Sequence, residues 1–139
     1  MNLQKPTVIV LTMFSWIAAG SVLAQTSPVP KPDRNGNYFS NDAPIKGTVS
    51  GRLMAGSLWQ VVSRGLNCRS QKGTRHRIVR QFKQGGLLQA DVGRGGADEV
   101  LLNAKDENGN PWMRVRSAQG TNYNCYVRAN RLYIQPKTR

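Results

Sequence analysis

From about residue 48 onward the sequence is a succession of short apolar, β-branched and aromatic segments separated by turns rich in glycine and asparagine. In WMRVR (112–116), the apolar Met113 and Val115 alternate with Trp112 and two arginines, the two-residue period of a strand with one buried face. No helical period persists beyond one turn in this region. The pattern predicts an all-β domain, built as a small barrel or sandwich. The predicted strands are SLWQVV (57–62), LNCRS (66–70), RIVRQF (77–82), EVLLNA (99–104), WMRVR (112–116), CYVRA (125–129) and LYIQ (132–135), with a turn at Asn108-Gly109.

The first 24 residues have the composition of an export signal. One basic residue, Lys5, precedes an apolar run over 7–22, and Val22-Leu23-Ala24 places small residues at the −3 and −1 positions of a cleavage site. A membrane anchor is the alternative, but it needs about 20 apolar residues and this run is shorter. We expect cleavage after Ala24 and no integral membrane span in the mature chain, which places the protein in the periplasm or outside the cell.

Residues 25–46 are predicted to be a flexible linker. Pro28, Pro30, Pro32 and Pro44 punctuate this segment, and few apolar residues lie between them. Such a composition buries too little apolar surface to offset the entropy of ordering the chain. The predicted organisation is therefore a signal peptide over 1–24, a Pro-rich linker over 25–46 and one β domain over 47–139.

Only two cysteines occur, Cys68 and Cys125, and both follow the predicted cleavage site. An even pair in an exported protein predicts a disulfide bond, with two free buried thiols as the alternative. Closing so long a loop restricts the unfolded chain, which contributes roughly 4 kcal/mol in the chain-entropy model. A small domain with a marginal core needs a contribution of that size.

The chain is strongly basic, with a formal net charge of +13. No acid occurs between Asp42 and Asp91, whereas nine Lys or Arg residues fall there. Such a field favours anionic partners: cell-wall polymers, nucleic acids or acidic lipid headgroups. Because export is predicted, envelope polymers rank first and nucleic acid second. A solvated basic face without a ligand is the alternative.

The segment LNCRSQKGTRHRIVRQFKQG (66–85) resembles the signature of bacterial SH3-like (SH3b) domains. Those domains open with Leu-Asn-apolar-Arg-Ser, continue through a Gly-Thr turn and an apolar pair, and end in Lys-x-Gly. Further on, WMRV (112–115) resembles the Trp-containing strand of the family, and CYV (125–127) resembles its Gly-Trp-Val segment. The sequence departs from the pattern at Gln71-Lys72, where Gly-Pro is common, and at Tyr126, where Trp is usual. The matching residues of the first motif are Leu66, Asn67, Cys68, Arg69, Ser70, Gly73, Thr74, Ile78, Val79, Phe82 and Gly85.

This resemblance covers about residues 57–134 and implies a small SH3-like barrel. In the family fold both cysteine positions flank the same seam, which agrees with the predicted disulfide. The resemblance also implies a non-catalytic binding module of the cell envelope whose ligand is an anionic cell-wall component or peptide, with peptidoglycan first. Barrels of this kind bind extended ligands on an aromatic-lined surface ringed here by arginines. The candidate ligand-binding residues are Arg69, Arg75, Arg77, Trp112, Arg114 and Tyr126, with burial of Trp112 in a second small core as the alternative for that residue.

Residues for catalysis or metal binding are scarce. The single histidine, His76, lies in a basic turn with no acid nearby to orient it, so we expect no enzyme activity. Two cysteines and one histidine cannot fill a structural zinc site, and the acidic loop around Asp106 lacks the spacing of a calcium loop. No nucleotide-binding glycine motif occurs, so no metal or cofactor is expected. The functional alternatives are a basic nucleic-acid-binding protein and a secreted protein-interaction or inhibitor domain; the sequence does not indicate an oligomeric state.

Overall fold

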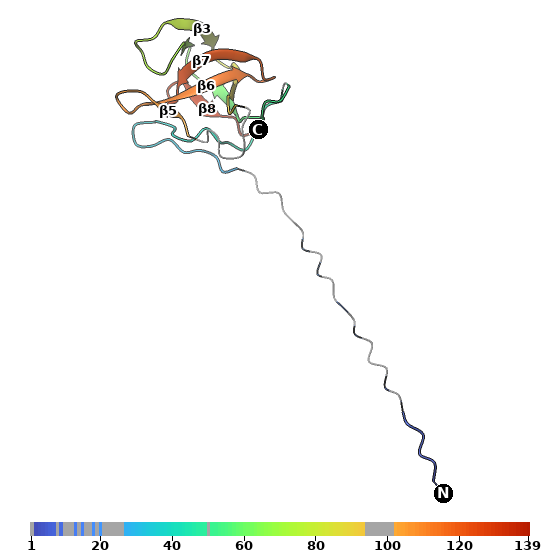
Figure 1. Cartoon of the computed structure of the whole chain (residues 1–139). Coiled ribbons are helices and arrows are strands. Elements are labelled where there is room, and N and C mark those ends of the chain that lie inside the picture. The colour runs from blue at the N-terminus through green and yellow to red at the C-terminus, as the bar shows by residue number, and fades with distance from the viewer. Residues whose placement is uncertain are drawn as a thin grey trace.

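A computed structural model describes residues 2–7, 9, 13, 15, 18, 20, 27–49, 51–93 and 102–139 of the chain (Figure 1). This part contains eight strands and no helix, which confirms the predicted all-β class. Much of the predicted signal peptide lies outside the described residues. No helix in the described ranges has the length and apolarity to cross a membrane. The strands are β1 Leu58–Val61, β2 Gly65–Arg69, β3 Ile78–Lys83, β4 Leu87–Ala90, β5 Ala104–Lys105, β6 Pro111–Ser117, β7 Asn122–Arg128 and β8 Ile134–Pro136.

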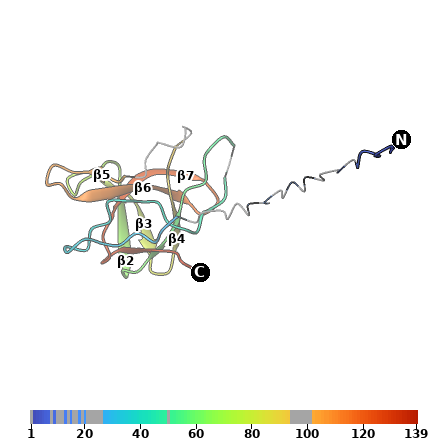
Figure 2. The ribbon, with the colours of Figure 1, turned by 90° about the horizontal axis from the view of Figure 1, so that it is seen from below.

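All eight strands belong to one antiparallel sheet, in the order β3-β2-β7-β6-β4-β1-β8, with β5 paired to β6 outside this path. β6 is central because it pairs with β7, β4 and β5. The sheet is not closed into the predicted barrel: in the described part of the chain, no ladder joins its end strands β3 and β8. It is nonetheless strongly curved, with β6 and β7 on one side and β3 and β4 on the other (Figure 2).

The hydrophobic core lies inside this curve and draws on almost every strand. The alternation predicted for 112–116 is confirmed on its apolar side, since Met113 and Val115 are both buried in the core. The core comprises Tyr38, Ala43, Trp59, Val61, Leu66, Cys68, Leu88, Ala90, Met113, Val115, Cys125, Val127, Ala129 and Ile134.

Two strand predictions differ from the structure. In EVLLNA (99–104), residues 99–101 lie outside the described ranges, Leu102 is exposed, and β5 begins only at Ala104. LLQA (87–90) was not predicted as a strand, yet it forms β4 and pairs with both β1 and β6. The adjacent Leu87 and Leu88 obscure the two-residue period of this strand in the sequence, because both are apolar but only Leu88 is buried.

The prediction that residues 25–46 form a flexible linker is wrong for 33–46, which pack against the sheet. Tyr38 and Ala43 are buried, and the Tyr38 ring meets the Trp59 ring edge-on at a centroid distance of 5.0 Å. The Trp59 indole donates a hydrogen bond to the Asn41 carbonyl at 3.3 Å. The few apolar residues among the prolines are therefore enough to order the segment, because they fill the core beside Trp59.

A short turn occurs twice, as DRNGN (33–37) and DENGN (106–110). In each, Oδ1 of the leading aspartate accepts hydrogen bonds from two backbone N–H groups, two and four residues later, at 2.8–3.0 Å. The glycines, Gly36 and Gly109, have φ values of 84° and 78°, which other residues rarely adopt. Arg128 donates to Asn37 Oδ1 in the first turn and to the carbonyl of Pro111, the residue that follows the second turn. The repeated turn thus anchors the N-terminal segment to the β5–β6 hairpin.

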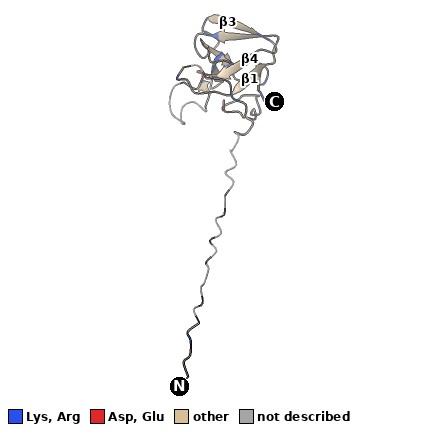
Figure 3. Ribbon diagram, turned by 90° about the vertical axis from the view of Figure 1, so that its right-hand side faces the viewer, with Lys and Arg blue, Asp and Glu red and all other residues tan. Residues whose placement is uncertain are grey.

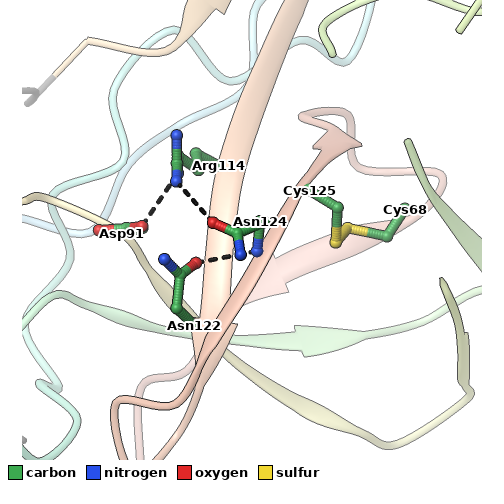
Figure 4. Close-up of a disulfide and its surroundings, with 6 residues drawn as sticks. All are labelled: Cys68, Asp91, Arg114, Asn122, Asn124 and Cys125. Atoms are coloured by element: carbon green, nitrogen blue, oxygen red, sulfur yellow. Dashed lines mark hydrogen bonds and ion pairs between the residues drawn. A yellow bond between two sulfur atoms is a disulfide. The ribbon is translucent and has the colours of Figure 1, made fainter. Parts of the chain in front are cut away.

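Cys68 of β2 and Cys125 of β7 form a disulfide, as predicted, with their Cα atoms 5.4 Å apart (Figure 4). Both cysteines are fully buried in the core. The bond joins two neighbouring strands that are paired at a single position, Arg69 opposite Tyr126. It therefore reinforces the strand pair with the fewest paired residues in the sheet. A disulfide fits an extracellular or periplasmic location.

Candidate functional site

A groove of about 490 Å³ lies over the outer face of β6 and β7. Its walls come from the N-terminal segment, from Leu53, from the residues that follow β4 and from the residues that lead into β5. It is larger than a second hollow of about 180 Å³ and contains three of the six predicted ligand-binding residues. Its lining consists of Asn41, Leu53, Asp91, Gly93, Leu102, Asn103, Ala104, Trp112, Arg114, Asn122 and Tyr126.

The strand register brings the three predicted residues together. Arg114 of β6 lies directly opposite Tyr126 of β7, so their side chains are cross-strand neighbours on one face. Trp112 precedes Arg114 by two residues and therefore shares that face. The Arg114 guanidinium carbon is 5.9 Å from the centroid of the Tyr126 ring, within cation–π range.

The Arg114 side chain is held in place by two partners (Figure 4). Its Nε donates to Asp91 Oδ2 at 3.0 Å, and its terminal nitrogen donates to Asn124 Oδ1 at 3.1 Å. Asn124 has a φ of 51°, and its backbone N–H donates a hydrogen bond to Asn122 Oδ1 at 2.8 Å. This irregularity of β7 turns the Asn124 amide toward Arg114, while 40% of the Arg114 side chain remains exposed for a ligand.

A second arginine, Arg116, binds the same Asp91 carboxylate from the buried side of the groove. The Arg116 side chain is fully buried and donates to Asp91 Oδ1 at 3.3 Å. It also donates twice to Gln89 Oε1, at 2.9 and 2.7 Å, and once to the Met54 carbonyl. Burial lowers the pKa of Arg116 and the charge of Asp91 raises it, but an arginine stays protonated at any physiological pH. Two positive charges therefore meet one negative charge, and the groove keeps one uncompensated positive charge beside Tyr126.

Trp112 is not the surface aromatic that the sequence analysis proposed. Its side chain is only 3% exposed, and its indole N–H donates to Asp106 Oδ2 at 2.8 Å. The ring forms a floor shared by the groove and the smaller hollow, in agreement with the alternative of burial in a second small core. The half-buried Tyr126 is therefore the aromatic ring available for contact with a ligand.

Side-chain amides stiffen the opposite wall of the groove. Asn103 donates to the Tyr38 carbonyl at 2.8 Å, so its oxygen faces Asn41, which donates to it at 3.2 Å. This leaves Asn41 Oδ1 buried without a hydrogen-bond partner among the described residues. An unsatisfied buried acceptor is uncommon in native proteins, so Asn41 Oδ1 is a candidate acceptor for a ligand donor at this wall.

The other three predicted residues lie outside the groove. Arg69 lines the smaller hollow of about 180 Å³, where it donates to the His76 carbonyl at 2.9 Å. Arg75 lies in the exposed turn before β3, at 3.4 Å from Glu107, and Arg77 is exposed at the end of that turn. Neither Arg75 nor Arg77 lines a described hollow. The predicted set therefore divides into a groove group, Trp112, Arg114 and Tyr126, and three arginines near β2 and β3.

Sequence reasoning missed three residues that shape the groove. Asn122 and Asn124 precede the CYV motif, and asparagine tolerates the left-handed backbone and closes local turns, so their spacing was a usable signal. Asp91 had no comparable signal. It is an isolated acid after β4, and only the ladder between β4 and β6 brings it to Arg114 and Arg116.

We expect Asp106 to make the protein sensitive to acid. Partial burial raises the pKa of this carboxyl, but hydrogen bonds from Trp112, Asn110 and Asn108 and the charge of Arg128 outweigh burial and lower the pKa below its ordinary value. A carboxyl whose pKa is lowered by folding contributes stability above about pH 4, and this is lost as the pH falls through the folded-state pKa. Thermal melts at pH 7 and pH 3 should show a smaller acid-induced drop for Asp106→Asn than for the unmodified protein.

Glu107→Gln is the matched control for this measurement, because its carboxyl is the exposed neighbour of Asp106. It should retain the acid-induced drop of the unmodified protein. Equal drops for Asp106→Asn and the unmodified protein would show that the contacts of Asp106 do not couple folding to protonation.

Comparison with protein-family models, with characterised proteins and with solved structures gives no significant match. The SH3b assignment therefore stays a prediction from the motif at 66–85. Within the described residues, no group of three or more His, Cys, Asp or Glu side chains is placed to bind a metal ion.

Proposed function

We propose that this chain is an exported, non-catalytic binding module of the cell envelope with an SH3-like architecture. Its ligand is an anionic cell-wall component or peptide, with peptidoglycan as the first choice. The observation that supports this most directly is the partly exposed guanidinium of Arg114 in a groove beside Tyr126, where Arg114 and Arg116 share the single negative charge of Asp91.

The charge of the groove favours a carboxylate or phosphate ligand. The Arg114 guanidinium is held by Asp91 and Asn124, so little side-chain entropy remains to be lost when a ligand binds. An arginine pre-oriented in this way can form charge-assisted hydrogen bonds with a carboxylate. The net charge of +13 attracts such ligands from a distance.

The remaining lining favours a ligand with both apolar and amide groups. Tyr126, Leu53 and Leu102 offer apolar surface, while Asn103 and Asn122 offer amides and Asn41 an unsatisfied acceptor. Peptidoglycan combines stem peptides, which carry carboxylates and amide N–H groups, with glycan strands whose sugars present flat apolar faces to aromatic rings. A groove with these features matches that chemistry better than it matches a uniform polyanion.

Retention on purified sacculi tests the proposal. The unmodified protein should sediment with sacculi at low salt, and Arg114→Gln should reduce the apparent affinity about tenfold, as expected for the loss of a charge-assisted contact. Arg34→Gln is the matched control, because it removes the same charge from an exposed position outside the groove. Arg34→Gln should bind within about twofold of the unmodified protein. Equal losses of affinity for both variants would show that binding depends only on the net charge of the protein. No retention of the unmodified protein at low salt would contradict the proposal.

Nucleic-acid binding is the second candidate function, and it rests on the acid-free basic stretch around β2 and β3. There Arg80 lies 4.4 Å from the centroid of the Tyr123 ring, which in turn packs on Phe82. Aromatic rings beside basic side chains are the usual surface for single-stranded nucleic acid. Titration with single-stranded DNA across salt concentrations separates the two functions. A steep salt slope that Arg114→Gln leaves unchanged would favour nucleic acid at this second surface.

A further inference from the structure

β3 is an end strand of the sheet and is mostly uncovered. It pairs with β2 from Gly65 opposite Lys83 to Arg69 opposite Ile78, and no second strand pairs with it in the described part of the chain. Five of its six residues are exposed. In Figures 1 and 3 it forms the outer margin of the molecule. None of its residues lines either hollow, so this edge is separate from the groove of the proposed function.

The two end strands of the sheet differ in how readily they could pair with a further strand. The opposite end strand, β8, has three residues, and its last residue, Pro136, has no backbone N–H to offer a further strand. β3 is twice as long and contains no proline. Along its free side, alternate residues direct their N–H and C=O groups to solvent at the spacing of a strand. Ile78 and Val79 add apolar contact area there, with exposures of 44% and 36%.

The charge on this edge is of one sign. Arg77, Arg80 and Lys83 lie on or beside β3, and no acid occurs anywhere between Asp42 and Asp91. Among the described carboxylates, only Glu107 forms an ion pair near this edge, with the exposed Arg75, and such a pair is weak. Arg80 is further held over the Tyr123 ring, which fixes its position for a partner.

We propose that β3 is a docking edge for an extended, acidic polypeptide segment of a partner protein, which adds to the sheet as a new strand. The free backbone groups of β3 provide the main-chain hydrogen bonds, and Arg77, Arg80 and Lys83 select for carboxylates. A second copy of this chain fits less well, because two β3 edges would bring like charges together. A nucleic acid or an anionic polysaccharide would satisfy the charges but not the alternating backbone donors and acceptors.

Isotope-resolved NMR of the oxidised protein tests this with a synthetic peptide of alternating valine and glutamate. Saturable binding is expected, with shifts concentrated along β3 and slowed hydrogen exchange of its solvent-facing amides. A version of the peptide with alternate amides N-methylated should bind at least about tenfold more weakly, because each methyl group removes a main-chain donor. A valine–lysine peptide should not bind.

Charge reversal supplies the protein-side test. Arg80→Glu combined with Lys83→Glu should weaken the valine–glutamate peptide by at least about tenfold, whereas Lys31→Glu with Arg34→Glu, an exposed pair away from β3, should change it less than about twofold. If the variant with Arg80→Glu and Lys83→Glu fails to fold, the comparison of methylated and unmethylated peptides on the unmodified protein still tests the proposal. Equal binding of the methylated and unmethylated peptides, stronger binding of single-stranded DNA at the same residues, or concentration-dependent dimerisation through β3 would each overturn the proposal.

Discussion

Reducing the disulfide between Cys68 and Cys125 is expected to lower the melting temperature by well over 10 °C. The bond closes a loop with a sequence separation of 57 residues, which corresponds to roughly 4 kcal/mol of unfolding free energy in the chain-entropy model. In a domain of this size each 1 kcal/mol shifts the melting temperature by about 4–8 °C. Both sulfur-bearing side chains lie in the core between β2 and β7, so their release also loosens the packing of these strands.

The control for this experiment is the double variant Cys68→Ala with Cys125→Ala. It should melt near the temperature of the reduced protein, and adding reductant to it should change nothing. An unmodified protein that melts at the same temperature with and without reductant would contradict this part of the account.

Replacing Arg116 by alanine is expected to cost about 3 kcal/mol of unfolding free energy. The side chain is fully buried, and its loss strips Gln89 and the Met54 carbonyl of their charged donors while leaving a cavity beneath Asp91. Gln89 also accepts from the Gly56 N–H and donates to the Thr48 and Ala118 carbonyls. The loss therefore spreads into residues 47–49 and 51–56, which include Leu53 at the rim of the groove. Equilibrium denaturation measures the effect.

Arg114→Ala is the matched comparison, two residues away on the same strand and face. Because its side chain is 40% exposed, its ion pair with Asp91 is screened by solvent and should contribute less than about 1 kcal/mol. Arg114→Ala should thus weaken ligand binding with little effect on stability. Arg116→Ala should instead lower the unfolding free energy as its main effect. Similar stability losses in the two variants would show that Arg116 is not the structural member of the pair.

The strand class could be predicted from the sequence because one face of each strand is apolar. The alternation of Met113 and Val115 identified β6, and the even pair of cysteines identified the disulfide that the structure contains. The burial of the side chains on the other face of β6 could not be predicted. Trp112 and Arg116 alternate with core residues, which predicts solvated side chains, but the turn around Asp106 covers the first and the segment around Met54 covers the second.

The N-terminal segment shows how composition can mislead. Its prolines indicated a flexible linker, yet Tyr38 packs edge-on against Trp59 and DRNGN (33–37) forms the same turn as DENGN (106–110). The repeated Asp-x-Asn-Gly-Asn pattern was visible in the sequence and would have predicted an ordered turn at both places. The sequence does not reveal that Arg128 bonds both Asn37 in the first turn and Pro111 directly after the second, because these contacts depend on the path of the sheet.

The groove was half predictable for a related reason. Trp112, Arg114 and Tyr126 were chosen as aromatic and basic residues of strands, and the β6–β7 register places them on one face. Asp91 sets the net charge of the site by pairing with two arginines, and it directly follows β4, a strand that was not predicted from the sequence. Long-range pairing, which local patterns do not encode, therefore decides the electrostatics of the site.

The most direct test of the account is an NMR titration of the isotope-labelled, oxidised protein with soluble peptidoglycan fragments. We expect saturable shifts that are largest at the Trp112 indole N–H and at the amides of Arg114 and Tyr126. Arg114→Gln should strongly reduce these shifts. No shifts at high fragment concentration, or shifts confined to β2 and β3, would contradict the claim that the groove over β6 and β7 binds an anionic wall ligand.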